Sequence, residues 1–336
     1  MTVGEAVAYW YFMFRAFRHA DTTVALIRNY IRVHIRGSAL GSMRLEDART
    51  SDYQNFFNLL LKSGNRNKIK SLNCYGQPLS PATVTKIRQI LIGTCAWAMR
   101  EGFITKNYAG ETERLCVKKF SKTASVFTLD QQRVFLARTK KHRYHFAYVL
   151  FFYTGCRRGE ILGLSWNDVF LDKQYICIRN TLIMVRGTPI FQKDRAKNDS
   201  SLRIIPLPAK LCELFNEWRV RQNREKEACS DWHNPHNLVF TRKDGSFINP
   251  AYFSRNFKNI CKDLGFPGNY HLHSTRHTWA TNMLQSGVSL TDVQVLGGWS
   301  SPDVLLNVYS HSFQESRRKA IDTMFSVVYA ATSDPS

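Results

Sequence analysis

A basic segment without apolar periodicity divides the chain and constrains its fold more than any other feature of the sequence. It covers residues 117–126, where lysines stand among small residues. Before this segment apolar residues recur at helical spacing, whereas helical and strand-like patterns alternate after it. With 336 residues, the chain is long enough for two domains that each bury a core. We therefore predict a first domain at residues 1–116, a linker at 117–126, a second domain at 127–311 and a C-terminal tail helix at 312–336.

Helical spacing predicts that the first domain is a four-helix unit. Its clearest helix starts at Ser80 and Pro81, because a hydroxyl cap followed by proline is a frequent helix start. The second helix is expected to be capped by Asp21, and the third by Thr50 or Ser51. One face of the clearest helix consists of Val84, Ile87, Leu91, Thr94 and Ala98. The four predicted helices cover residues 2–17, 21–35, 50–61 and 79–103.

The second domain is predicted to combine helices with a small antiparallel β-sheet. The β-branched runs at 175–185 and 203–207 are typical of strands, and they flank turns at Arg186-Gly187 and Asn198-Asp199. The predicted fold class is a two-domain, mainly α protein whose second domain is mixed α+β. Helical patterns surround the strands, at residues 128–139, 144–155, 209–228, 251–265 and 274–287.

The balance of charge indicates a polyanionic partner. Lysine and arginine number 47 against 26 aspartates and glutamates, which gives a formal net charge of +21. Such an excess favours nucleic acid ahead of an anionic membrane surface. Lys86 and Arg88 lie off the apolar face of the fourth helix and are candidate DNA contacts. Lys118, Lys119 and Lys122 of the linker are either ordinary solvated side chains or further phosphate contacts.

Composition argues against several other classes of protein. No run of eighteen apolar residues is present, and the N-terminus lacks a basic segment followed by a cleavage site, so we expect neither a membrane span nor export. The eight cysteines are scattered without a C-x-x-C pair, which disfavours a disulfide framework or a structural zinc site and fits a reducing cytoplasm. We expect no metal and no cofactor.

Four separated stretches carry side chains suited to the attack of a phenol on a phosphodiester. They are TGCRRGEILGL at 154–164, the strand-turn-strand with Lys193 and Lys197, HSTRHTWAT at 273–281, and LGGWSSPDVLLNVYSH at 296–311. Planar guanidinium groups suit the charge that builds on the non-bridging phosphate oxygens. The phenol must lose a proton and the departing 5′ oxygen must gain one, which suits a histidine and a lysine. A tyrosyl phosphate conserves the energy of the broken bond, so rejoining needs neither nucleotide nor metal.

Tyr309 ends a short helix that is expected to follow Trp299. Ser301 and Pro302 repeat the pattern of hydroxyl cap and proline, and the next residues give this helix an apolar side. Taken alone, a tyrosine in such a pattern is a buried core aromatic. Tyr309 is favoured as a nucleophile only because the same chain also contains the other three stretches.

The order of these motifs resembles that of the tyrosine recombinase family, the phage-integrase type of site-specific recombinase. TGCRRGEILGL is similar to the family's first-arginine motif, and HSTRHTWAT to its His-x-x-Arg-His motif. LGGW stands where the family commonly has leucine-glycine-histidine, and NVYSH supplies the nucleophile. The resemblance covers roughly the whole chain. It implies a set of catalytic residues, Arg157, His273, Arg276, Trp299 and Tyr309, with Glu160 and His277 as supporting residues.

The resemblance also implies a catalytic lysine in KDRAKNDSSLRIIPL at 193–207. Lys197 fits this place, and Lys193 is the alternative and otherwise a candidate DNA contact. An indole N–H can donate to a phosphate oxygen but cannot transfer a proton. With Trp299 in place of histidine, proton transfer therefore depends more on His273 and the lysine.

What the resemblance implies is an integrase that cleaves DNA through a 3′-phosphotyrosyl intermediate. The first domain would be a helical core-binding domain and the second the catalytic domain. Four protomers would assemble on double-stranded recombination sites and exchange strands through a Holliday junction. Away from DNA, the protein would be a monomer or a weak oligomer. An accessory directionality factor and a cytoplasmic, nucleoid-associated location in a prokaryotic host are implied. No arm-binding domain, common in phage and transposon integrases, is evident ahead of the helical unit.

Two alternatives remain open at this point. One is a sequence-specific DNA-binding protein on the same fold whose chemistry has lapsed, and the other is a type IB topoisomerase or a resolvase-like enzyme. The tail at 312–336 also has two interpretations, because Ile321, Met324 and Phe325 recur at near-helical spacing. Its helix either packs on its own domain or, as the family implies, docks on a neighbouring protomer.

Overall fold

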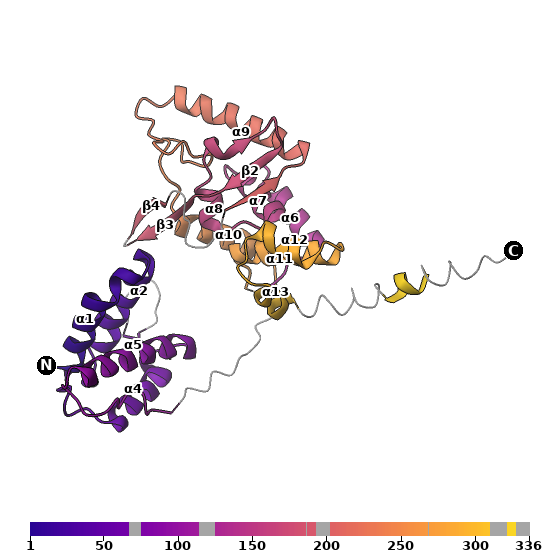
Figure 1. Ribbon diagram of the computed structural model, residues 1–336. Helices are drawn as coiled ribbons and strands as arrows, with labels where there is room; N and C mark the ends of the chain where they lie inside the picture. Colours follow the sequence, from indigo (N-terminus) through magenta and orange to yellow (C-terminus); the bar gives the residue numbers. More distant parts are fainter. Residues whose placement is uncertain are drawn as a thin grey trace. The chain divides into compact units, whose positions relative to one another are not determined.

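The computed structural model describes residues 1–66, 75–113, 125–185, 187–192, 202–267, 269–309 and 321–326, except the side chains at 304 and 307–309. The chain divides into two compact units, Met1–Ser121 and Lys122–Ser336 (Figure 1). This boundary falls inside the predicted linker, most of which lies outside the described residues.

The first unit is helical, as predicted. Gly93 lets α5 (Pro81–Arg100) approach α1 (Val3–Phe14) closely, since a Cβ there would lie 2.4 Å from the ring of Trp10. Tyr53 of α4 (Thr50–Ser63) is fully buried in the same core, where its hydroxyl accepts a hydrogen bond from Cys95. The elements are α1 (Val3–Phe14), η1 (Ala16–Arg18), α2 (Asp21–Asn29), the π-helical η2 (Tyr30–Ile35), α3 (Ala39–Ser42), α4 (Thr50–Ser63) and α5 (Pro81–Arg100).

The predicted helix starts in this unit had mixed outcomes. α5 begins as predicted, because Ser80 caps it through its hydroxyl and Pro81 is its first residue. All five residues predicted for its buried face are buried. The cap at Asp21 was wrong, since Asp21 is the first helical residue and Ala20 precedes it in extended conformation. The cap at Thr50 or Ser51 was also wrong, because both residues are helical and the N-cap of α4 is Arg49, whose backbone N–H donates to Asp52 at 2.9 Å.

The second unit contains helices and two small antiparallel sheets. One sheet has the order β1-β2-β5, and the other is the β3-β4 hairpin. Its helices are α6 (Leu129–Thr139), α7 (His145–Thr154), α8 (Arg158–Leu162), η4 (Trp166–Asp168), α9 (Ala209–Glu227), α10 (Pro250–Asp263), α11 (Leu272–Gln285), α12 (Leu290–Gly297) and α13 (Pro302–Tyr309). Its strands are β1 (Val169–Phe170), β2 (Tyr175–Ile178), β3 (Thr181–Val185), β4 (Thr188–Gln192) and β5 (Arg203–Pro206).

The β-branched run predicted as one strand is two strands in different sheets. The chain leaves the first sheet at Arg179 and Asn180, because both side chains bond to the buried carboxylate of Asp168. Of the predicted turn at Arg186-Gly187, Gly187 lies between β3 and β4 with a left-handed φ of 87°, and Arg186 lies outside the described residues. β5 pairs with β2 so that Arg203 lies opposite Ile178. The predicted turn at Asn198-Asp199 lies outside the described residues.

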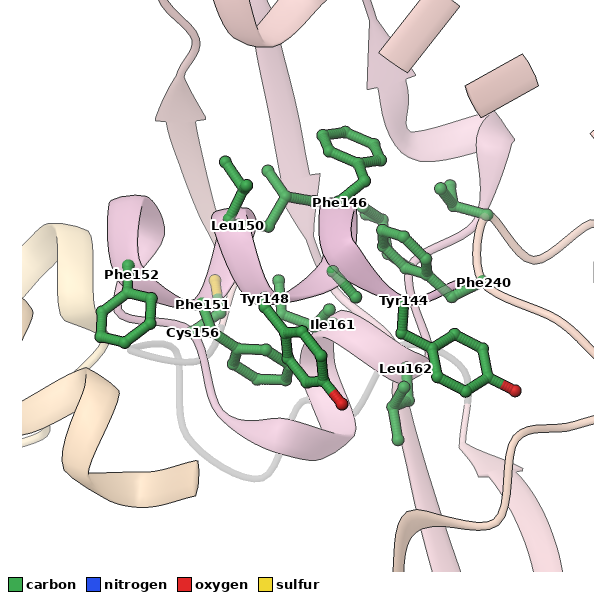
Figure 2. Packing of buried hydrophobic residues seen from close by; sticks show 14 of the residues in the cluster. Tyr144, Phe146, Tyr148, Leu150, Phe151, Phe152, Cys156, Ile161, Leu162 and Phe240 are labelled. Carbon is green, nitrogen blue, oxygen red and sulfur yellow. The ribbon is translucent and has the colours of Figure 1, made fainter. Parts of the chain in front are cut away.

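The core of the second unit is built around α7, whose side chains are buried on almost every side (Figure 2). Phe146 packs toward Phe240, while Tyr148 and Phe151 contact Phe253 of α10. A smaller cluster joins α11, α12 and α13 through Trp279, Val293 and Leu305, among others. These two clusters fix the helices that carry the predicted catalytic residues. In the part of the chain that the structure describes, no helix has the length and apolar character of a membrane span.

Candidate active site

Arg157 is placed by the turn between α7 and α8. The turn requires glycine at Gly155, whose φ is 60° and where a Cβ would lie 2.4 Å from Trp279. Arg157 then precedes α8, and its backbone N–H donates to Oε2 of Glu160 at 2.7 Å. Its guanidinium donates to Oε1 of Glu160 at 2.8 Å and to the carbonyl of Gly298 at 2.7 Å. The Arg157 side chain is 42% exposed, so it can also reach a ligand.

Glu160 joins Arg157 to a second arginine that the sequence analysis missed. Arg203 is buried and donates to the two carboxylate oxygens of Glu160 at 3.3 and 2.8 Å. Burial by itself raises the pKa of Glu160, but Arg203 and Arg157 outweigh it and lower that pKa to about 2. The signal that could have revealed Arg203 is strand alternation, which places it on the same buried face of β5 as Ile205.

Arg276 is almost completely buried on α11, with 1% of its surface exposed. Its Nη1 donates to the carbonyl of Gly155 at 2.8 Å, whereas its Nη2 has no hydrogen-bond partner among the described residues. Burial, followed by the charge of Arg157, lowers the pKa of Arg276 to about 9. A buried cation with an unused donor is costly unless an anion completes it. This guanidinium is therefore suited to receive an oxygen of a phosphate.

Histidines lie beside Arg276 on the same helix. The rings of His273 and His277 are 4.7 Å apart and nearly perpendicular. Desolvation, then His277 and Arg276, lower the pKa of His273 to about 4, and desolvation with His271 and Arg276 does the same for His277. Both imidazoles are thus neutral at pH 7. Neutral His273 can accept a proton, and a bound phosphate would offset its cationic neighbours and raise its pKa.

Trp299, which follows α12, packs against the guanidinium of Arg276. The Arg276 guanidinium carbon lies 3.6 Å from the centre of the indole ring, and the indole stacks on Trp279 at 6.3 Å. Glycine at Gly297 is required by this packing, since a Cβ there would lie 1.8 Å from the ring. The structure therefore gives Trp299 a stacking contact besides the predicted donation of its N–H to phosphate.

The helix that carries Tyr309 starts as predicted. The Ser301 hydroxyl accepts from the backbone N–H of Asp303 at 3.1 Å, and Pro302 is the first helical residue. Leu305 is fully buried in the cluster of α11 and α12, which attaches α13 to the helix of Arg276. Tyr309 is the last residue of α13, and its side chain lies outside the described residues.

The structure describes only some of the remaining predicted residues, which are the catalytic lysine and the DNA contacts. Lys193 and Lys197 lie outside the described residues, as do the three linker lysines. Lys86 is exposed on α5. Arg88 bonds within its own unit, to the hydroxyl of Thr112 at 2.9 Å and to the Thr112 carbonyl at 2.7 Å. These bonds give Arg88 a structural role that its sequence position did not indicate.

Comparison with known proteins identifies the family. The model of the phage integrase family matches residues 126–316, more than half of the chain, and this region contains all the motifs described above. The chain belongs to the phage integrase family. Its resemblance to the tyrosine recombinases is thereby confirmed, and the chain is a recombinase of this family.

Named relatives and solved structures agree with this assignment. A "tyrosine recombinase XerC-like" protein of Caldanaerobacter subterraneus is 25% identical over 342 residues, which cover 96% of this chain and 83% of the relative. The ICEBs1 integrase of Bacillus subtilis is 23% identical over 73% of this chain and 66% of its own length.

Two structural neighbours share the fold. The Tn1549 transposon integrase, solved in complex with a circular intermediate DNA, matches with a TM-score of 0.74 at 18% identity, over 96% of this chain and 99% of that one. A lambda integrase dimer bound to a COC′ core site matches with a TM-score of 0.64 at 18% identity, over 90% of this chain and 75% of that one. The predicted fold class, mainly helical with small antiparallel sheets, is confirmed.

Proposed function

We propose that this recombinase cuts and rejoins double-stranded DNA at specific sites through a covalent bond between Tyr309 and a 3′ phosphate. The observation that carries the proposal is the buried guanidinium of Arg276, whose Nη2 has no partner in the described part of the chain and which neighbours the guanidinium of Arg157. Together, the two arginines fit the non-bridging oxygens of a phosphodiester.

The proposed reaction follows from these side chains. Arg157 and Arg276 hold the scissile phosphate and stabilise the charge that develops on its non-bridging oxygens. Neutral His273 takes the proton of the Tyr309 phenol. The phenolate oxygen then bonds to phosphorus, the bond from phosphorus to the 5′ oxygen breaks, and a lysine protonates the departing oxygen. Rejoining reverses these steps with a different 5′ hydroxyl.

The acid for the departing oxygen is assigned to Lys197 in this proposal. Lys197→Ala is expected to cut ordinary DNA slowly and to cut a substrate with sulfur at the 5′ bridging position normally, because a thiolate departs without a proton. Single-turnover rates on the two substrates measure this, and Lys193→Ala is the matched control. If sulfur rescues the Lys193 variant and leaves the Lys197 variant slow, the acid is Lys193.

The partners of the protein are proposed from its charge and its family. A net charge of +21 supports binding to double-stranded DNA, and the two structural neighbours are integrases bound to DNA. Phosphate contacts by Lys86, Lys118, Lys119 and Lys122 belong to this proposal, as does the tetramer on DNA. An accessory directionality factor and a cytoplasmic, nucleoid-associated location are proposed on the same basis.

The covalent intermediate provides the direct test. Duplexes selected from a random pool for binding to the protein would supply the site, and a nicked version would trap the reaction. We expect a protein–DNA adduct on a denaturing gel, with equal yield in EDTA because the arginines supply the positive charge. Absence of an adduct from a selected site contradicts the proposal. Loss in EDTA and recovery with magnesium, at unchanged DNA binding, contradicts its metal independence.

The tail is proposed to dock on a neighbouring protomer. Residues 321–326 are helical, and Ile321, Met324 and Phe325 are each at least 60% exposed. Deleting residues 316–336 should weaken recombination of full sites and leave cleavage of a half-site intact, as measured with both substrates. Normal recombination by the deletion variant excludes docking in trans. Unfolding of this variant favours packing of the tail on its own domain.

A further inference from the structure

Arg203 is a buried cation that the reaction described above does not use. It lies on β5 with 7% of its surface exposed. Its Nε donates to the carbonyl of Leu296 at 2.7 Å, and two of its other donors reach Glu160. A further contact joins its Nη2 to Sγ of Cys156 at 3.4 Å. Arg203 therefore joins strand β5 to the turn before α8 and to the end of α12.

Glu160 is shared between Arg203 and Arg157 at both carboxylate oxygens. Oε1 accepts from Arg157 at 2.8 Å and from Arg203 at 3.3 Å, while Oε2 accepts from the Arg157 backbone at 2.7 Å and from Arg203 at 2.8 Å. Without Arg203, the lone pairs that it now occupies on Glu160 could accept further hydrogen bonds from the Arg157 guanidinium. Those N–H donors of Arg157 would then no longer be available to bind a phosphate.

The segment at 296–299 is held by the same two arginines. Arg203 binds the Leu296 carbonyl and Arg157 binds the Gly298 carbonyl, so both ends of the turn into Trp299 are fixed. Trp299 in turn carries Arg276 on its indole face. A displacement of this segment would therefore move the second arginine as well as the first.

We propose that Arg203 is a positioning residue, which orients Arg157 through Glu160 and Arg276 through the 296–299 segment without touching the substrate. This inference rests on the proposed reaction and adds a residue to it. A lysine cannot replace Arg203, because one ammonium group cannot reach Glu160 and the Leu296 carbonyl in the geometry of a planar fork.

The test uses Arg203→Lys, which keeps the charge. Its DNA affinity should equal that of the wild type. Its single-turnover cleavage rate should fall by about 10²-fold, which is the usual effect of displacing a reacting group. On a methylphosphonate substrate, which lacks one non-bridging charge, the defect should shrink, as it should for Arg157→Ala. A defect caused by a smaller folded fraction would be the same on both substrates.

Two further variants complete the design. Arg203→Met with Glu160→Gln removes both charges of the pair, so it should fold and still cleave slowly. Arg143→Lys is the matched control, because Arg143 pairs with Glu225 and binds the Thr241 carbonyl, and it should cleave at the wild-type rate.

The outcomes separate this inference from the proposed function. A wild-type protein that forms no adduct overturns the proposed function. If the wild type forms the adduct and Arg203→Lys cleaves equally fast, only the positioning role is overturned. Unfolding of both Arg203 variants, or an equal defect on the two substrates, assigns Arg203 to stability alone and also overturns the positioning role.

Discussion

Tyr309→Phe protein is expected to bind its DNA site as tightly as the wild type and to form no covalent adduct. The substitution removes one oxygen and leaves the ring, so the packing of α13 through Leu305 should persist. Without the phenol, no group in the proposed reaction can form the bond to phosphorus. A nicked substrate and a denaturing gel measure the adduct, and a filter or mobility assay measures binding.

Tyr175→Phe is the matched control for this experiment. Tyr175 lies on β2, and its ring centre lies 4.8 Å from that of Phe170 on β1. This variant should form the adduct at the wild-type rate. A covalent adduct of undiminished yield from Tyr309→Phe would remove Tyr309 from the role of nucleophile.

Arg276→Met is the second substitution with a large expected effect, and it should lower activity without lowering stability. Cleavage should fall by about 10² to 10³-fold, because a donor to the charged oxygens of the transition state is lost. The melting temperature should not fall. Arg276 is a cation whose burial lowers its pKa to about 9, and a methionine side chain of similar length can still pack on Trp299.

Single-turnover cleavage and thermal unfolding on the same preparations measure the two effects. Arg157→Ala should lower cleavage by a similar factor, but it leaves the buried carboxylate of Glu160 with Arg203 alone and should destabilise the protein. A normal cleavage rate in Arg276→Met contradicts the proposed role of Arg276. A large fall in its melting temperature contradicts the view that the buried charge of Arg276 is electrostatically costly to the fold.

Much of the site was readable from the sequence because its motifs are local. Arg157 and Glu160 are three residues apart, as are His273 and Arg276, so each pair is placed by a single helical turn. The cap at Ser301 and the buried Leu305 of α13 follow from neighbouring residues for the same reason. Membership of the phage integrase family was likewise predictable, since it rests on the order of such short motifs.

In the second unit, the predictions failed where a residue's neighbours are distant in the chain. The sequence around Arg203 predicts a β-branched strand. Its Nε, however, donates to a carbonyl 93 residues later, and nothing in the neighbouring sequence indicates this partner. The contact of Arg276 with Trp299 also joins residues of different elements. The break between β2 and β3 depends on Asp168, which a count of β-branched residues does not include.

The helical first unit, the mixed second unit, the family and the types of side chain in the site could all be predicted from the sequence. These properties depend on periodicity, caps and short motifs, which act within a few residues. Three features became visible only in the folded chain: Arg276 is buried with an unused donor, Glu160 is shared by two arginines, and Arg203 links β5 to the 296–299 segment. Burial and charge pairing depend on which distant segments pack together, and such packing is a property of the whole fold.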